Sequence, residues 1–298
     1  MDLPVSPLHV DLIVKFGGSA VTDKTKLETL DEESLRKAAE LISQCYKQRL
    51  TCIVVHGAGS FGHHQAKEYN VNSGWVHFED KNEMDRVKRG FCLTRKSVTM
   101  LNQHVVNSLL QQNIPAVGLS VCGEWVTEEG TVVTYSTNSV RDALRNGFIP
   151  VLHGDCVLDR VKGCNILSGD TIIRTLSEAF KVNRVVFLTS VKGVYNCPPE
   201  NNSEACLLKT ITVGKHGNST ATSSGEGRNI DTKNEGTDVT GGMTLKFQTA
   251  VGIARDTEGK TKVFICMIGS RYATAACLYG ANKRHDEDDS GTEIIFTT

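Results

Sequence analysis

The stretch CIVVHGAGSFGHH, residues 52–64, decides the fold, because an apolar run passes directly into a turn with three glycines in six residues. Such a run, bounded by glycine, is typical of a strand buried on both faces. The turn is predicted to open a helix, whose first amides and positive dipole end favour an anion. Two interpretations remain open: a phosphate-binding loop assisted by His63 or His64, or a solvated turn capped by a histidine.

The same order of strand, glycine and helix recurs along the chain. Apolar runs predict further strands, and apolar residues at helical spacing predict helices. The predicted strands cover 11–16, 114–119, 148–155, 184–190, 261–269 and 292–296, and the predicted helices cover 32–48, 84–112, 138–146 and 171–180. We therefore predict an α/β fold, a three-layer αβα sandwich with a mainly parallel central sheet, whose ligands bind beyond the carboxyl ends of the strands.

Composition excludes several classes of protein. Of the 298 residues, 39% are apolar, 22% are charged, and the net charge is −1, which disfavours a long basic face for nucleic acid. The amino terminus lacks the pattern of a signal peptide, and no stretch approaches the roughly 18 apolar residues of a spanning helix. Ten cysteines occur without a C-x-x-C pair, which argues against a zinc ribbon or a thioredoxin-type motif. We expect a cytoplasmic protein that does not insert into membranes.

One segment breaks the alternation of strand and helix. Residues 214–237 are polar, rich in Gly, Ser and Thr, and show no periodicity. We expect a flexible loop there, within a single domain that spans residues 1–298.

Two lysines lie beside glycine turns. Lys15 stands at the end of the first strand in KFGGS, residues 15–19, and Lys246 follows Gly242 by four residues in DVTGGMTLK. A cation beside exposed backbone amides holds phosphate oxygens well, and Lys246 lies about one helical turn inside its predicted helix. The alternatives are an ordinary β-turn with a surface lysine and an exposed helical lysine.

Two aspartates follow further turns. Asp155 ends HGD and Asp170 ends ILSGD, so both are expected after a strand and near a helix start. Such an aspartate is usually a helix N-cap. Beside phosphate-binding lysines it would orient those lysines or hold Mg²⁺. Taken together, the glycine turns, lysines and aspartates supply what phosphoryl transfer requires, namely amide donors, cations and a metal.

These motifs resemble those of the amino-acid-kinase superfamily across almost the whole chain. The resemblance is carried, in order, by KFGGSAVTDK, VVHGAGSFGHHQA, PVLHGD, ILSGD, DVTGGM-x-x-K and the final GTEI. Within that superfamily the chain is most similar to the isopentenyl phosphate kinase family. The deciding feature is His63, directly after the glycine loop, since relatives that act on carboxylates lack this histidine.

The resemblance implies a role for each matching residue. Catalysis is assigned to Lys15, His63, Asp170 and Lys246. The nucleotide phosphates would be bound by Lys15, Gly17, Gly18, Ser19, Gly59, Asp170, Gly242 and Lys246. The acceptor would be bound by Lys24, Ala58, Gly59, Gly62, His63 and Gly154. No residue is assigned as a direct metal ligand.

The implied reaction passes a phosphoryl group from ATP, with Mg²⁺, to isopentenyl phosphate by direct in-line transfer. The partner is then an isoprenoid monophosphate, the helix over 84–112 would line the space for its tail, and a homodimer is expected from the family. Because the acceptor is already an anion, positioning and charge stabilisation would carry catalysis.

One departure keeps alternatives open. Many relatives have aspartates where this chain has Ser190 and Lys192. The alternatives are a kinase of the same fold for another small phosphate or carboxylate acceptor, and a catalytically silent ATP-binding regulatory protein. A dinucleotide-dependent oxidoreductase is disfavoured, because no acidic residue ends a strand about 20 residues after GAGSFG.

Overall fold

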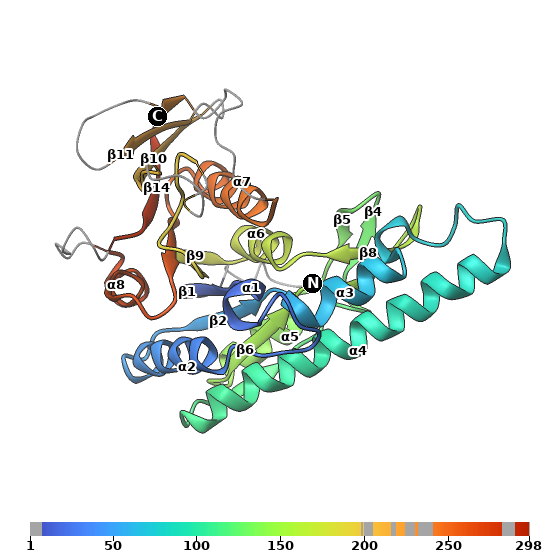
Figure 1. Ribbon diagram of the computed structural model, residues 1–298. Helices are drawn as coiled ribbons and strands as arrows, with labels where there is room; N and C mark the ends of the chain where they lie inside the picture. The colour runs from blue at the N-terminus through green and yellow to red at the C-terminus, as the bar shows by residue number, and fades with distance from the viewer. Residues whose placement is uncertain are drawn as a thin grey trace, which may run out of the picture. The chain divides into compact units, whose positions relative to one another are not determined.

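The computed structural model describes most of the chain (Figure 1). The described residues are 8–197, 199, 205–215, 219–223, 230–231, 241–281 and 290–297. The chain divides into two compact units. The first unit contains Met1–Lys15, Gln44–Cys52 and Arg174–Thr298, and the second contains Phe16–Ser43 and Ile53–Ile173.

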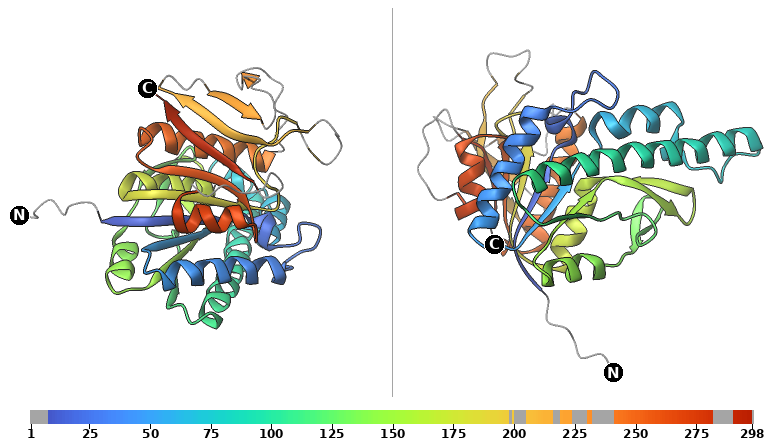
Figure 2. Two further views of the ribbon diagram at one scale, coloured as in Figure 1. Left: turned by 90° about the vertical axis from the view of Figure 1, so that its left-hand side faces the viewer. Right: turned by 90° about the horizontal axis from the view of Figure 1, so that it is seen from below.

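The first unit contains most of the carboxyl-terminal half of the chain (Figure 2). Its strands lie in the order β12-β11-β10-β14-β13-β9-β1. They are β1 (His9–Phe16), β9 (Lys181–Thr189), β10 (Leu208–Gly214), β11 (Ser219–Ser223), β12 (Ile230–Asp231), β13 (Lys262–Met267) and β14 (Thr292–Thr297). The pairs β9–β13 and β10–β14 are parallel, whereas β13–β14 and β10–β11 are antiparallel. The helices of this unit are α7 (Gly241–Asp256), α8 (Arg271–Tyr279) and most of α6 (Gly169–Ala179).

The second unit contains two groups of strands. In one group β2 (Cys52–His56), β6 (Ile149–His153) and β3 (Ala116–Gly118) are parallel neighbours in that order. The other group is a four-stranded sheet in the order β5-β4-β7-β8, made of β4 (Val126–Glu128), β5 (Thr131–Thr134), β7 (Asp155–Asp159) and β8 (Gly163–Leu167). The helices are α1 (Gly18–Val21), most of α2 (Glu32–Lys47), α3 (Gly59–Glu68), the 3₁₀ turn η1 (Val71–Ser73), α4 (Lys81–Gln111) and α5 (Asn138–Arg145).

Local signals account for the helix boundaries. Asp31 caps α2, since its Oδ1 accepts a hydrogen bond from the Ser34 amide at 3.0 Å. Asp80 caps α4 in the same way, through the Asn82 amide at 2.9 Å. The predicted segment 84–112 corresponds to one continuous helix, α4, with Gly90 in its interior. A Cβ on Gly90 would lie 2.1 Å from the Tyr69 Cβ, so only glycine allows this contact.

The core follows the apolar runs in the sequence. Every residue of β2 and of β6 is buried, and β1 is buried over its last five residues. This agrees with strands covered by helices on both faces, and the prediction of an α/β fold with a mainly parallel sheet is confirmed. Among the described residues, no helix has both the length and the apolar composition to cross a membrane.

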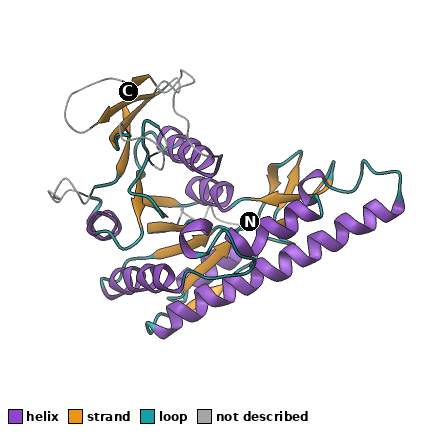
Figure 3. Ribbon diagram, viewed as in Figure 1, coloured by secondary structure: helices purple, strands orange, loops and turns teal. Residues whose placement is uncertain are grey.

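Three features differ from the predictions or extend them. The four-stranded β5-β4-β7-β8 sheet was not predicted, and of its strands only one before Asp170, here β8, was expected (Figure 3). Asp155 begins strand β7 and does not lie near a helix start. Within 214–237, residues 219–223 form a strand paired with β10, and much of the remaining segment lies outside the described residues, so flexibility there stays a prediction.

Candidate active site

The first two glycine turns pack directly against each other in the second unit. The Gly57 amide donates to the Phe16 carbonyl at 3.0 Å, and a Cβ on Gly18 would lie 2.4 Å from the Gly59 nitrogen. Both turns lead straight from a strand into a helix, β1 into α1 and β2 into α3. Glycine is therefore required here because two backbones touch, and the turns together present one glycine-rich surface.

Thr22 connects the two turns. Its hydroxyl donates to the Gly18 carbonyl at 2.7 Å and accepts from the Ser60 amide at 3.0 Å. Gly59 lies beside it in a left-handed conformation, with φ +52°. These contacts fix the entry of α3, so the amides of its first turn have a defined direction.

A third turn continues the arrangement. The Gly154 amide donates to the His56 carbonyl at 3.0 Å, and a Cβ on Gly154 would lie 3.2 Å from the Gly169 nitrogen. Gly169 opens α6, and the buried Asp170 lies in the first turn of that helix. The predicted residues Gly18, Gly59, Gly154 and Asp170 thus come from successive turns that contact one another.

The predicted acceptor residues lie on and beside α3. Ala58 is the residue before the helix, and Gly62 packs so closely that a Cβ there would meet the Val98 side chain of α4 at 2.9 Å. His63 follows Gly62 and is exposed. Lys24 lies in the exposed turn after α1 and forms no hydrogen bond or ion pair with the residues described here.

Two predicted lysines belong to the first unit. Lys15 lies in β1 with 4% of its surface exposed, and Lys246 lies in α7 with 9% exposed. Both exposed fractions are low for lysine, which is almost never fully buried without a partner. The predicted placement of Lys246 about one turn inside a helix is confirmed, since α7 begins at Gly241.

Asp155 has a different environment from the one expected. Its carboxylate has no exposed surface and accepts hydrogen bonds from Arg95 Nε at 3.2 Å and Ser120 Oγ at 2.9 Å. The Cys156 amide donates to the same group at 2.8 Å. Because Asp155 is neutralised by an arginine, it does not fit the hypothesis that it orients lysines or holds Mg²⁺.

Two buried histidines lie immediately before two of the glycine turns. His56 ends β2 and His153 ends β6, and their rings stack with centroids 5.4 Å apart. Burial, together with the neighbouring His153, lowers the pKa of His56 to about 3. Burial likewise lowers the pKa of His153, although Asp155 acts in the opposite direction. Both rings are therefore neutral near pH 7.

The site offers donors for phosphate oxygens but few metal ligands. The amides of the first turns of α1 and α3 suit the anionic phosphates of ATP. Among the described residues, no group of three or more His, Cys, Asp or Glu side chains could hold a metal ion. Mg²⁺ commonly binds through one or two carboxylates together with substrate phosphates, and Asp170 is the site carboxylate that fits this arrangement.

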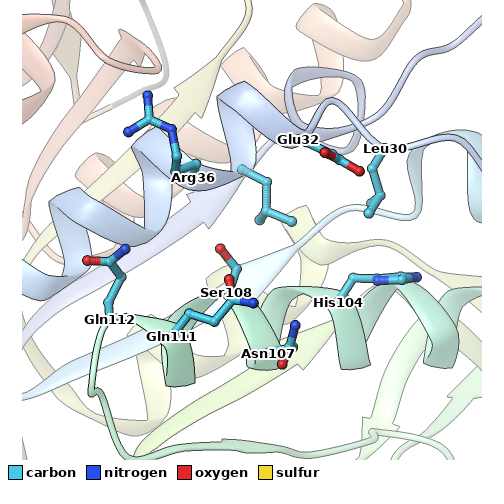
Figure 4. A pocket seen from close by; sticks show the side chains of 9 residues that line it. Leu30, Glu32, Arg36, His104, Asn107, Ser108, Gln111 and Gln112 are labelled. Carbon is cyan, nitrogen blue, oxygen red and sulfur yellow. The ribbon is translucent and has the colours of Figure 1, made fainter.

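Two hollows of the described structure lie elsewhere. One hollow of about 340 Å³ lies between α2 and α4 in the second unit (Figure 4). It is lined by Leu30, Glu32, Leu35, Arg36, His104, Asn107, Ser108, Gln111 and Gln112. Another hollow, of about 590 Å³, lies in the first unit between the ends of α6 and α7. None of the residues predicted to be catalytic lines either hollow.

Sequence reasoning missed several residues around the turns. Thr22, Arg95, Ser120 and the pair His56 and His153 were not assigned any role. The repeated dipeptide His-Gly, at residues 56–57 and 153–154, was the available signal for the pair.

Ser190 is exposed in the turn that follows β9, and Lys192 lies two residues further on.

Comparison with known proteins places the chain among kinases. Residues 12–267 match the model of the amino acid kinase family. The isopentenyl phosphate kinase of Arabidopsis thaliana is 37% identical, with 96% of this chain and 95% of the relative covered. The isopentenyl phosphate kinase of Methanothermobacter thermautotrophicus is 35% identical, with 82% of this chain and 86% of the relative covered.

Solved structures agree with this relationship. A crystal structure of isopentenyl phosphate kinase superposes with a TM-score of 0.75 at 29% identity, covering 95% of this chain and 99% of that chain. A UMP kinase from Bacillus anthracis, at 14% identity and a TM-score of 0.59, shares the fold alone. The chain therefore belongs to the amino acid kinase family, in the group that contains the isopentenyl phosphate kinases.

Proposed function

We propose that the protein transfers the γ-phosphoryl group of ATP to isopentenyl phosphate, which yields isopentenyl diphosphate and ADP. The observation that carries the proposal is the 37% identity with an isopentenyl phosphate kinase over 96% of this chain. The packed glycine turns and the exposed His63 support it, because a phosphate acceptor needs amide donors and a cation that it can reach.

On the nucleotide side, the glycine turns would hold the ATP phosphates through backbone amides. Gly17, Gly18 and Ser19 at the start of α1 would contribute there, together with Gly59 and Gly242. Lys15 and Lys246 would neutralise the charge that develops on the transferred group. Their low exposure supports this role, because a cation shielded from water acts more strongly on a nearby anion.

Mg²⁺ supplies charge neutralisation between phosphate oxygens when it is bound. Asp170, buried in the first turn of α6, would orient the lysines and would be the carboxylate on the metal side. No general base is required, since the acceptor oxygen is already anionic. Rate acceleration would then come from in-line positioning and from electrostatic stabilisation.

On the acceptor side, His63 would donate a charge-assisted hydrogen bond to the acceptor phosphate. Ala58, Gly59, Gly62 and Gly154 would shape the surface around it, and Lys24 would add a cation from its exposed turn. The isoprenoid tail would lie along α4. An apolar cluster there, with Val87 of the helix buried at 1% exposure and Phe91 packed against it, supports an apolar tail over a charged one.

A coupled ADP-release assay over a panel of acceptors tests this proposal. The panel contains isopentenyl phosphate, longer prenyl and alkyl monophosphates, glutamate, acetylglutamate and UMP. We expect ADP release to depend on a prenyl or alkyl monophosphate. Turnover of glutamate, acetylglutamate or UMP with none of isopentenyl phosphate would overturn the assignment, and absence of any acceptor-dependent ADP release would favour the silent ATP-binding alternative.

We also propose a homodimer in the cytoplasm. Strand β3 is the last in the strand order of the second unit, and the large apolar side chains of Leu110 and Phe148 are 51% and 41% exposed. These features favour an interface. All ten cysteines are free, as expected in a reducing compartment. Light scattering should give twice the 32.5 kDa of one chain, and a mass of one chain at micromolar concentration would contradict the dimer.

A further inference from the structure

The feature that carries a further inference is the hydrogen bonding of His56 within the glycine turn that it precedes. His56 Nδ1 lies 3.0 Å from the carbonyl oxygen of Gly57. A carbonyl oxygen only accepts, so Nδ1 carries the proton. His56 Nε2 lies 3.1 Å from the Asn102 amide nitrogen, which only donates, so Nε2 is the acceptor. Both bonds therefore require the same neutral tautomer, which the lowered pKa of His56 maintains.

The environment holds this ring in place. His56 has no exposed surface, and Asn102, at 3% exposure, also donates to the Val151 carbonyl at 3.2 Å. His153 stacks on the ring at an interplanar angle of 18° and makes the equivalent bond from its own Nδ1 to the Gly154 carbonyl at 3.0 Å. The ring of His56 thus has one orientation, fixed by a second helix and a second strand.

The orientation of the Gly57 carbonyl determines where the next amide points. The Gly57–Ala58 peptide is trans, and in a trans peptide the C=O and N–H bonds point in opposite directions. Because His56 holds the carbonyl toward the buried rings, the Ala58 N–H points away from them. No residue in the described part of the chain accepts a hydrogen bond from that N–H. The Ala58 amide is therefore a directed donor one residue before α3.

We propose that His56, stacked on His153, is a positioning residue that directs the Ala58 amide at the phosphate group of the acceptor. The inference rests on the proposed function, which places the acceptor beside Ala58 and His63. His56 itself does not touch the substrate. It acts by holding one peptide plane, so its loss should affect the acceptor more than the nucleotide.

Two conservative substitutions separate this role from a structural one. The amide nitrogen of an asparagine occupies the place of histidine Nδ1, whereas the amide of a glutamine reaches the place of Nε2. His56→Asn therefore keeps a donor for the Gly57 carbonyl and loses the contact to Asn102. His56→Gln keeps an acceptor for the Asn102 amide and loses the donor to the Gly57 carbonyl. His56→Phe keeps the stacked ring and loses both hydrogen bonds. Ile42→Ala, a buried change in α2 of the same unit, is a control for destabilisation alone.

We expect His56→Gln and His56→Phe to raise the KM for isopentenyl phosphate by about tenfold or more, with the KM for ATP within about twofold. His56→Asn should stay within about threefold of wild type for both substrates. Ile42→Ala should lower stability and leave both constants unchanged. The proposal is overturned if His56→Asn impairs acceptor use as much as His56→Gln, or if the KM for the acceptor stays at the wild-type value in His56→Gln.

A measurement on the unaltered protein keeps the proposal testable if a variant does not fold. In ¹⁵N-labelled protein, the Ala58 amide proton should shift downfield on titration with isopentenyl phosphate and, more weakly, with inorganic phosphate. An Ala58 resonance that does not move with either would contradict the proposal. If wild type binds phosphate at Ala58 but does not turn over isopentenyl phosphate, the proposed function fails and the role of His56 in directing the amide stands.

Discussion

Gly59→Ala tests whether the two glycine turns must touch. Gly59 has φ +52°, and a left-handed residue with a Cβ costs roughly 1–2 kcal/mol. A Cβ at Gly59 would also lie 2.2 Å from Thr22 Oγ1 and 2.7 Å from the Gly18 carbonyl oxygen. Thr22 must then move, which breaks its bonds to Gly18 and Ser60, at about 0.5–1.5 kcal/mol each. The expected loss of unfolding free energy is about 2–5 kcal/mol.

Gly147→Ala is the matched control for this substitution. Gly147 has φ +78° in the same unit, but a Cβ there would meet no atom within 4 Å, so only the backbone cost of roughly 1–2 kcal/mol applies. Urea unfolding, followed by the fluorescence of Trp75 and Trp125 in that unit, gives both values. Equal losses for the two variants would refute the argument that contact between the turns, and not backbone conformation alone, requires glycine at Gly59.

Four further variants test the site and its supports. His63→Ala should raise the KM for the acceptor by about tenfold or more while the KM for ATP changes little, and equal effects on both would contradict its placement. Lys15→Ala should lower kcat by about a hundredfold or more in steady-state assays, with smaller changes in KM, if the lysine acts on the developing charge. Arg95→Met should cost about 3–5 kcal/mol in urea unfolding, because the fully buried Asp155 carboxylate loses its cation. Asp159→Asn should destabilise the protein at pH 7. Burial would raise the pKa of Asp159, but hydrogen bonds from Lys162, Gly130, Thr127 and Val161 outweigh it and hold the pKa low, so the stability difference should shrink only as the pH falls below about 3.9.

The parts of the fold with strong periodicity could be predicted from the sequence. Buried strands such as β2 and β6 are continuous apolar runs that end in glycine, and α2 has both a cap at Asp31 and one apolar stripe. The β5-β4-β7-β8 sheet was missed because its strands are three to five residues long, too short for a pattern to emerge. Their partners are set by tertiary contacts that no local signal encodes.

The candidate site was predictable in composition but not in detail. The glycines were interpreted as a cradle for phosphate, whereas at Gly18 and Gly59 the structure gives a second reason, the contact between two backbones. Asp155 and Asp170 follow similar motifs, yet Arg95 neutralises one of them, and Arg95 lies 60 residues earlier in the chain. A side-chain pair so distant in sequence leaves no trace in the local motif.

The most direct test of the central claim is ³¹P NMR of purified protein with ATP, Mg²⁺ and isopentenyl phosphate. We predict that the monophosphate signal of isopentenyl phosphate is replaced by the two coupled signals of a diphosphate ester, with ADP formed in equal amount. Release of inorganic phosphate with ADP while isopentenyl phosphate persists, or no change in any signal, would contradict phosphoryl transfer to this acceptor.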